Sequence, residues 1–136
     1  MSTFIDRFRE AVGETGVRRS WSPAGYIEAW RSFVTECEEG YQWNIYEYEN
    51  ELSVRDAIEK VLSDANLAGT PEIRVFADAI DELDSRFESV VAAGPQIEEP
   101  PAPWWHRRVP ARAGEELAAD IEAQYSVRIE LSDHLV

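Results

Sequence analysis

At two places in the chain, a serine or threonine directly before a proline predicts the start of a helix. Ser22-Pro23 and Thr70-Pro71 each place a small hydroxyl residue directly before a proline. A serine or threonine can cap the free N–H groups at the start of a helix, and proline is favoured at the first helical position. Apolar residues follow both pairs at spacings of three and four, the period of a helix with one buried face. We therefore expect helices over about 22–39 and 71–93.

Three more helices are expected from the same period. The first covers about 2–13, with Ser2 as its N-cap and Gly13 as its stop. The others cover about 41–64 and 114–125.

Residues 95–112 have a different character, with five prolines and two adjacent tryptophans. Proline excludes a regular helix or central strand, and tryptophan rings are costly to leave in water. This segment is therefore expected to be extended and to lie along the helices. The alternation of Val127, Ile129 and Leu131 predicts one short strand within 126–131, for which no partner strand is evident. The predicted fold is one mainly all-α domain over 1–136, a four- to five-helix bundle with this extended segment packed on it.

The charge limits the partners that such a protein can bind. Against 27 acidic residues there are 13 basic ones, which gives a net charge of −14. Such a chain repels nucleic acids and anionic membranes, but it is attracted to basic proteins. No apolar run approaches the roughly 20 residues that cross a bilayer. Cys37 is the single cysteine, so no internal disulfide forms, as is typical of cytoplasmic proteins.

The segment 41–64 has two apolar stripes on a helical wheel, as expected of a central helix that is contacted from both sides. One stripe contains Tyr41, Ile45, Tyr48, Leu52, Ile58 and Leu62. The second contains Trp43, Tyr46, Val54, Ala57 and Val61. A sector with Glu49, Ser53, Asp56 and Lys60 is expected to face solvent.

A line of charged residues runs between the two stripes. Glu47, Glu51 and Arg55 are four residues apart, and glutamate before arginine is the favoured order for a helical ion pair. Asp84, at the edge of the apolar face of its own helix, is a second candidate partner for Arg55. Buried charges need partners, so we favour an ion network that fixes how the helices meet. The alternative is a carboxylate site in a cleft.

No motif for metal binding or covalent catalysis is present. His106 and His134 have no second histidine or cysteine at ligand spacing. Cys37 falls on the apolar face of its helix, where cysteine usually packs as a small apolar residue. We expect no cofactor, no metal ion and no catalytic residue.

One acidic pattern resembles a known enzyme family. Glu36-x-x-Glu39, together with Asp78, Asp81 and Asp84, resembles the paired acidic motifs of all-α nucleotide pyrophosphohydrolases. Because Glu36 and Glu39 are expected to project away from the apolar face of their helix, they should not converge on one cleft. The enzyme alternative is therefore a magnesium-assisted phosphohydrolase that uses Glu47, Glu51 and Asp84, with Arg55 on an anionic group.

The preferred hypothesis is an interaction module that binds a basic partner protein. Its candidate contact residues combine acids with aromatic rings, which are common in binding hot spots: Glu38, Glu39, Trp43, Tyr46, Glu47 and Glu49. In character, though not in any motif, this is similar to the small acidic immunity proteins of bacteria. If the second stripe is core, Trp43 and Tyr46 are buried instead, and a stripe left unpaired is also open to burial in a homodimer.

Overall fold

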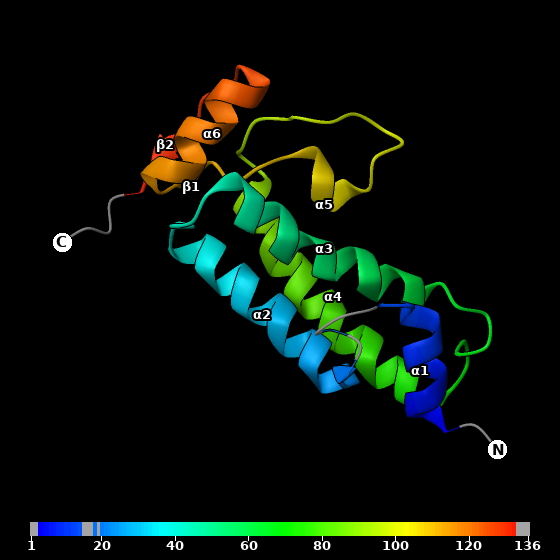
Figure 1. The fold of residues 1–136 in the computed structure, drawn as a ribbon. Coiled ribbons are helices and arrows are strands. Elements are labelled where there is room, and N and C mark those ends of the chain that lie inside the picture. Colours follow the sequence, from blue (N-terminus) through cyan, green and yellow to red (C-terminus); the bar gives the residue numbers. More distant parts are fainter. Residues whose placement is uncertain (1–2, 15–17, 19, 133–136) are drawn as a thin grey trace.

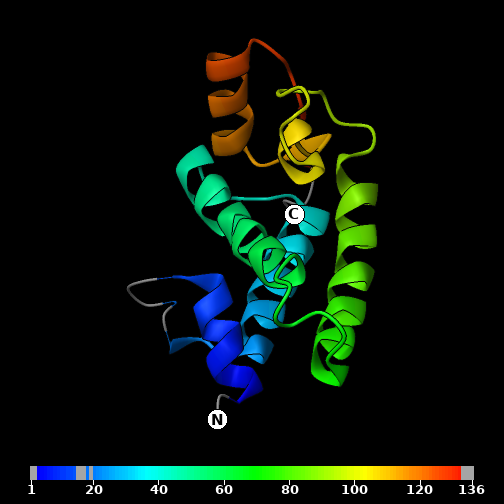
Figure 2. The same cartoon turned by 90° about the vertical axis from the view of Figure 1, so that its right-hand side faces the viewer.

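The computed structural model describes residues 3–14, 18 and 20–132, and it confirms a mainly all-α bundle. Its elements are α1 (Phe4–Val12), α2 (Pro23–Glu39), α3 (Ile45–Leu62), α4 (Pro71–Val91), α5 (Trp104–Arg107), β1 (Arg112–Ala113), α6 (Glu115–Tyr125) and β2 (Glu130–Leu131). Figures 1 and 2 show α1 at one end of the long helices and α6 with the strands at the other. Within the described residues, no helix is both long and apolar enough to cross a membrane.

The expected caps start α2 and α4. The Ser22 hydroxyl accepts a hydrogen bond from the Gly25 N–H at 3.1 Å, and the Thr70 hydroxyl accepts one from Ile73 at 3.2 Å. In α1 the cap is Thr3, whose hydroxyl accepts from the Asp6 N–H while the Asp6 carboxylate accepts from the Thr3 N–H. Ser2, the expected cap, lies outside the described residues. These local bonds satisfy N–H groups that have no partner inside the helix.

Helix α3 starts at Ile45, four residues later than the predicted start at Tyr41. The Asn44 side chain accepts from the Glu47 N–H at 2.9 Å, and Asp120 of α6 accepts from the Ile45 N–H at 3.0 Å. A carboxylate at this position also suits the positive end of the helix dipole. Trp43 therefore precedes the helix, and a helical wheel does not predict where its side chain points.

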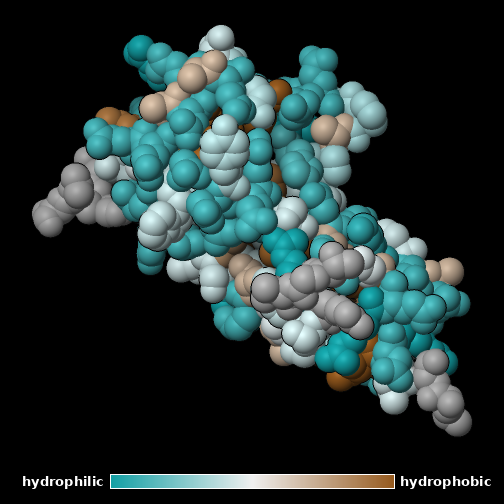
Figure 3. Space-filling view, in the orientation of Figure 1, coloured by the Kyte–Doolittle hydropathy of each residue, from teal (hydrophilic) through white to brown (hydrophobic). Residues whose placement is uncertain are grey.

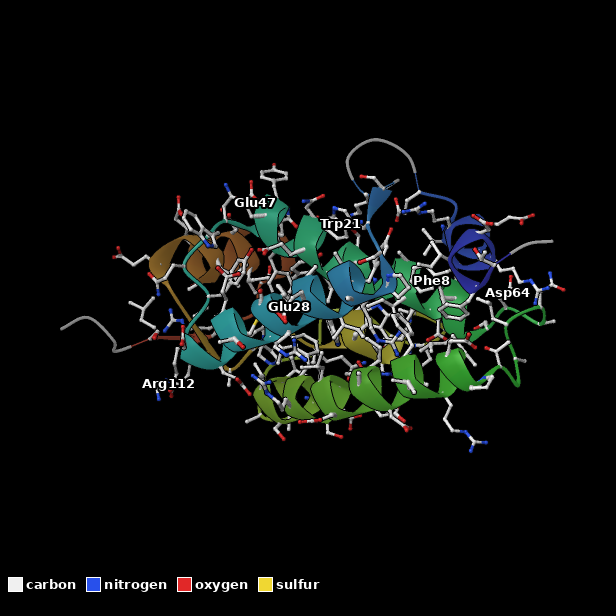
Figure 4. The ribbon with its side chains drawn as sticks, turned by 90° about the horizontal axis from the view of Figure 1, so that it is seen from below. Phe8, Trp21, Glu28, Glu47, Asp64 and Arg112 are labelled. Atoms are coloured by element: carbon white, nitrogen blue, oxygen red, sulfur yellow. The ribbon has the colours of Figure 1, made fainter. Side chains whose placement is uncertain are left out.

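Aromatic rings fill the space where α2 meets α3 and α4. Phe33 of α2 has four ring neighbours at centroid distances between 5.3 and 5.7 Å, namely Trp30, Tyr41, Tyr48 and Phe87. At the other end of the bundle, Phe8 of α1 packs edge-on against Phe76 of α4 at 5.2 Å, and Figure 4 shows this ring pointing inward. Large rings bury the most apolar area per residue, so these contacts contribute heavily to stability.

Residues 95–111, here called the strap, form a loop whose two limbs pair with each other. The Ile97 N–H donates to the Arg107 carbonyl at 2.7 Å, and the Val109 N–H donates to that of Pro95 at 3.2 Å. At the root of the loop, a Cβ on Gly94 would lie 1.7 Å from the Val109 carbonyl oxygen, so only glycine fits there. The strap includes the single helical turn α5, so the expectation of a wholly extended segment was wrong at that point.

Asp56 fastens the strap to α3. Its carboxylate accepts from Trp105 Nε1 at 2.8 Å and lies 2.7 Å from His106 Nε2. The Trp105 ring is 5% exposed, and the Arg55 guanidinium carbon lies 4.3 Å from its centroid, a cation–π contact. Asp56 was expected in solvent, but the strap covers part of it.

The predicted C-terminal strand is present as β2, and its partner is β1. The two strands are parallel, with Arg112 opposite Glu130 and Ala113 opposite Leu131. The sequence did not indicate this partner because it is only two residues long. Directly after β1, the Gly114 N–H donates to the Tyr41 carbonyl at 2.8 Å, which joins this unit to the start of α3.

The His106–Asp56 contact predicts a pH-dependent contribution to stability. The hydrogen bond to Asp56 raises the pKa of His106. Burial by itself raises the pKa of Asp56, but the hydrogen bonds from His106 and Trp105 outweigh it and lower that pKa. Because the pKa of His106 is higher in the folded protein than in the unfolded chain, protonated His106 stabilises the fold. This contribution is complete at a pH below the pKa of the unfolded chain, and it disappears as the pH rises through the pKa of the folded protein.

We therefore expect His106→Gln to lower the unfolding free energy by roughly 0.5–1 kcal/mol at about pH 6, and by much less at about pH 9. Urea denaturation at both pH values measures the difference. Lys60→Gln removes an exposed cation from α3 and serves as the control. An equal loss at both pH values for His106→Gln would contradict the prediction.

Candidate partner-binding surface

Two aromatic residues at the start of α3 are open to solvent, whereas Tyr41 and Tyr48 beside them are buried. Trp43 is 53% exposed and Tyr46 is 73% exposed. Later members of the same predicted stripe, Val54, Ala57 and Val61, are buried, and α1 packs on α3 at that end (Figure 1). Within the described part of the chain, the stripe is therefore covered only in its C-terminal half.

Glu36 joins Trp43 on this face. The Trp43 indole N–H donates to Glu36 Oε1 at 3.2 Å. Glu36 was expected to project away from any shared site. Instead, the connection after Gly40 returns beside the end of α2, and it brings Glu36 near Glu51 of α3, close enough for their carboxyl groups to interact.

Glu51 has a different partner from the one its sequence position suggested. Its carboxylate accepts a hydrogen bond from the Tyr41 hydroxyl, whereas the favoured helical pair was with Arg55. Burial raises the pKa of Glu51, and the carboxylates of Glu36 and Glu47 raise it further; together these outweigh the Tyr41 hydrogen bond, which lowers it. Acids that repel one another at a half-buried position are relieved when a cation binds beside them.

Arg55 and Asp84 form the buried pair. Arg55 Nε and Nη2 each donate to one Asp84 carboxylate oxygen at 2.9 Å, and both residues are under 10% exposed. Trp30 Nε1 donates to Asp84 at 3.0 Å, and Arg55 Nη1 donates to Glu59 at 3.0 Å. The two Asp84 oxygens match the planar guanidinium fork. Glu47 and Glu51 were expected in this network but lie outside it, because Arg55 reaches across to α4.

The four glutamates among the predicted contact residues do not form one cluster: one is paired with an arginine, and the others are exposed at different places. Glu38 accepts two bonds from Arg86 of α4, at 3.0 and 2.6 Å, and these lower the pKa of Glu38. Glu49 is exposed beside the strap, and Glu39 is exposed at the end of α2. Glu47 is exposed on the outer side of α3, away from α4, as Figure 4 shows.

Five residues thus make up a coherent candidate surface at the junction of α2 and α3, here called the acidic–aromatic surface: Glu36, Trp43, Tyr46, Glu47 and Glu51. Glu36 was noted only as part of the Glu36-x-x-Glu39 pattern, and its place beside Trp43 and Glu51 was not predicted, because the connection that brings these residues together is not helical. Figure 3 shows that the visible face of the molecule is mostly hydrophilic, with apolar residues in small patches. Among the residues that the structure describes, no group of three or more His, Cys, Asp or Glu side chains is placed to hold a metal ion.

Comparison with known proteins gives no match. No protein family fits the chain, and neither the curated proteins nor the solved structures contain a significant relative. The function proposed below therefore depends on the geometry and chemistry of this site.

The buried pair generates a stability prediction. Asp84→Asn takes the bidentate carboxylate from the buried Arg55 and leaves it only the contact with Glu59, so we expect a loss of about 3 kcal/mol in unfolding free energy, the lower end of the range for a broken buried pair. Asp81→Asn, at an exposed position one turn earlier on α4, is the control and should change it by less than about 0.5 kcal/mol. Chemical denaturation measures both.

A second variant separates the loss of the pair from general damage to α4. Adding Arg55→Met to Asp84→Asn removes the buried guanidinium that has lost its bidentate partner, and the asparagine oxygen still accepts from Trp30. The double variant should therefore be more stable than Asp84→Asn alone. If it is less stable, the cost of Asp84→Asn does not come from the buried charge of Arg55.

The repulsion between Glu36 and Glu51 predicts a substitution that increases stability. Glu51→Gln keeps an acceptor for Tyr41 but removes the repulsion with Glu36. We expect a gain of roughly 0.5–1 kcal/mol in unfolding free energy at neutral pH, the scale for a partly exposed charge pair. Because a raised carboxyl pKa favours the fold at low pH, the gain should shrink as the pH falls toward about 4. Thermal unfolding across this range measures it, and a loss of stability at neutral pH would contradict it.

Proposed function

We propose that this protein is a cytoplasmic interaction module that binds a basic partner protein through the acidic–aromatic surface. The observation that carries the proposal is the exposure of two large aromatic side chains, Trp43 and Tyr46, at 53% and 73%. Tyrosine and tryptophan are enriched among the residues that dominate binding energy. A ring left in water forgoes the free energy that its burial would add, and a partner that covers both rings would gain that free energy on binding.

The acids of the same surface define the charge of the partner. Glu36 accepts a hydrogen bond from the Trp43 indole, and burial, together with the carboxylates of Glu36 and Glu47, raises the pKa of Glu51. A lysine or arginine from a partner would relieve the repulsion between these carboxylates, and the net charge of −14 would speed its approach. An immunity-type role, in which an acidic protein covers the cationic surface of a toxin, has this chemistry.

A second copy of the chain is a poor occupant of the same surface. A symmetric dimer would bring the acids of one surface against those of the other, and like charges at an interface cost several kcal/mol. Sedimentation at neutral pH and low salt should therefore show the same oligomeric state for the parent protein and for Trp43→Ala.

The test is affinity capture from a lysate of the source organism with the immobilised protein, followed by titration of the captured partner. Trp43→Ala and Tyr46→Ala should each weaken binding about 10-fold or more, as expected for hot-spot residues. Raising the salt concentration should weaken binding by the parent protein, because the acids act through charge. The captured partner should be basic.

Val75→Ala is the matched control. Val75 is 71% exposed on α4, and it is a large apolar residue outside the acidic–aromatic surface. Its substitution should leave affinity unchanged. Equal affinity for the parent protein and both aromatic variants, or an acidic partner, would refute the proposal.

A further inference from the structure

A cavity of about 280 Å³ lies between α3, the strap and α6, and the acidic–aromatic surface does not use it. Aliphatic side chains from all three elements form part of its walls: Ile45 and Leu52 from α3, Ile97 and Val109 from the strap, and Ile121 from α6. Since a water molecule occupies about 30 Å³, the cavity has room for a small organic molecule. It lies just below the usual size range of ligand pockets, and its mainly apolar lining is typical of them.

Aromatic side chains complete the lining. Trp105 and Tyr48 are buried, whereas Tyr125 is half-buried. The strap limb that supplies Trp105 is held in place by Asp56, so this part of the wall is fixed. These rings add apolar surface against which the body of a ligand can pack.

The charged residues at the rim favour a cation. Glu49 of α3 and Glu98 of the strap are both exposed and both line the cavity. They act on the same neighbour, because burial and then these two carboxylates raise the pKa of Tyr125. His106 also lines the cavity, but Asp56 pairs with it at 2.7 Å. Arg108 is the remaining cation in the lining, and it donates to the Gly94 carbonyl at 2.8 Å. Two carboxylates thus outnumber one guanidinium at this rim.

We propose that this cavity binds a small amphipathic amine. Its apolar body would lie among Leu52, Ile97, Ile121 and the rings, and its ammonium group would lie at the rim between Glu49 and Glu98. This site is independent of partner binding, since neither Trp43 nor Tyr46 lines it.

The test compares three probes of similar size and different charge by isothermal titration calorimetry and thermal shift at neutral pH. 2-Phenylethylamine is the cation, 2-phenylethanol the neutral analogue and 3-phenylpropionate the anion. The amine should bind saturably at millimolar concentrations and raise the melting temperature. The alcohol should bind more weakly, and the carboxylate most weakly. No saturable binding of the amine, or equal or tighter binding of either analogue, would overturn the proposal.

Variants then locate the site. Glu49→Gln and Glu98→Gln should each weaken amine binding about 2- to 5-fold, the range for an exposed charge pair, and leave the alcohol unaffected. Glu88→Gln, at an exposed position of α4 outside the cavity, should change nothing. Ile97→Trp fills the cavity from the strap and should abolish binding of both probes. Amine binding that is unchanged in both rim variants would overturn the site, whatever the folding of the filled variant.

Discussion

Arg55 and Asp84 form a buried ion pair at the point where α2, α3, α4 and the strap meet. Asp84 of α4 takes both arms of the guanidinium and also the indole N–H of Trp30 from α2. The guanidinium face supports Trp105 of the strap, which bonds in turn to Asp56, the next residue along α3. One desolvated charge pair thus joins three helices and the strap, and such a pair is tolerated in a core only when its hydrogen bonds are satisfied this fully.

The helices could be predicted because their signals are local. Ser22-Pro23 and Thr70-Pro71 determine where two helices begin, since a cap and a first-turn proline act within four residues. The start of α3 was missed because a tertiary contact, from Asp120 to the Ile45 N–H, helps to decide it. The parallel pairing of β1 with β2 joins residues that are 18 positions apart, for example Arg112 and Glu130, and a two-residue strand has no pattern to detect.

The charged sites were only partly predictable, because tertiary contacts decide which charged residues become partners. Two partners were predicted for Arg55: Glu51, from its spacing along the helix, and Asp84 of α4. The structure pairs Arg55 with Asp84, whose two oxygens lie at 2.9 Å, and not with Glu51. Glu36 and Glu51, or Asp56 and His106, come together only when loops bring distant segments side by side. What the sequence did supply was the set of residues at the start of α3, and the structure then separated the buried rings of Tyr41 and Tyr48 from the exposed ones.

The two limbs of the strap are joined at their base, so the tip of this loop can vary in length. Gly94 touches the Val109 carbonyl, and Pro95 and Ile97 bond to residues of the returning limb, so the loop is shut at its own base. The cost of closing a longer loop grows only slowly with its length. The stretch between Glu98 and Pro103 can therefore lengthen or take up an inserted sequence while the limbs stay paired. In evolutionary terms, it is the position where this bundle can acquire a new element without rebuilding its core.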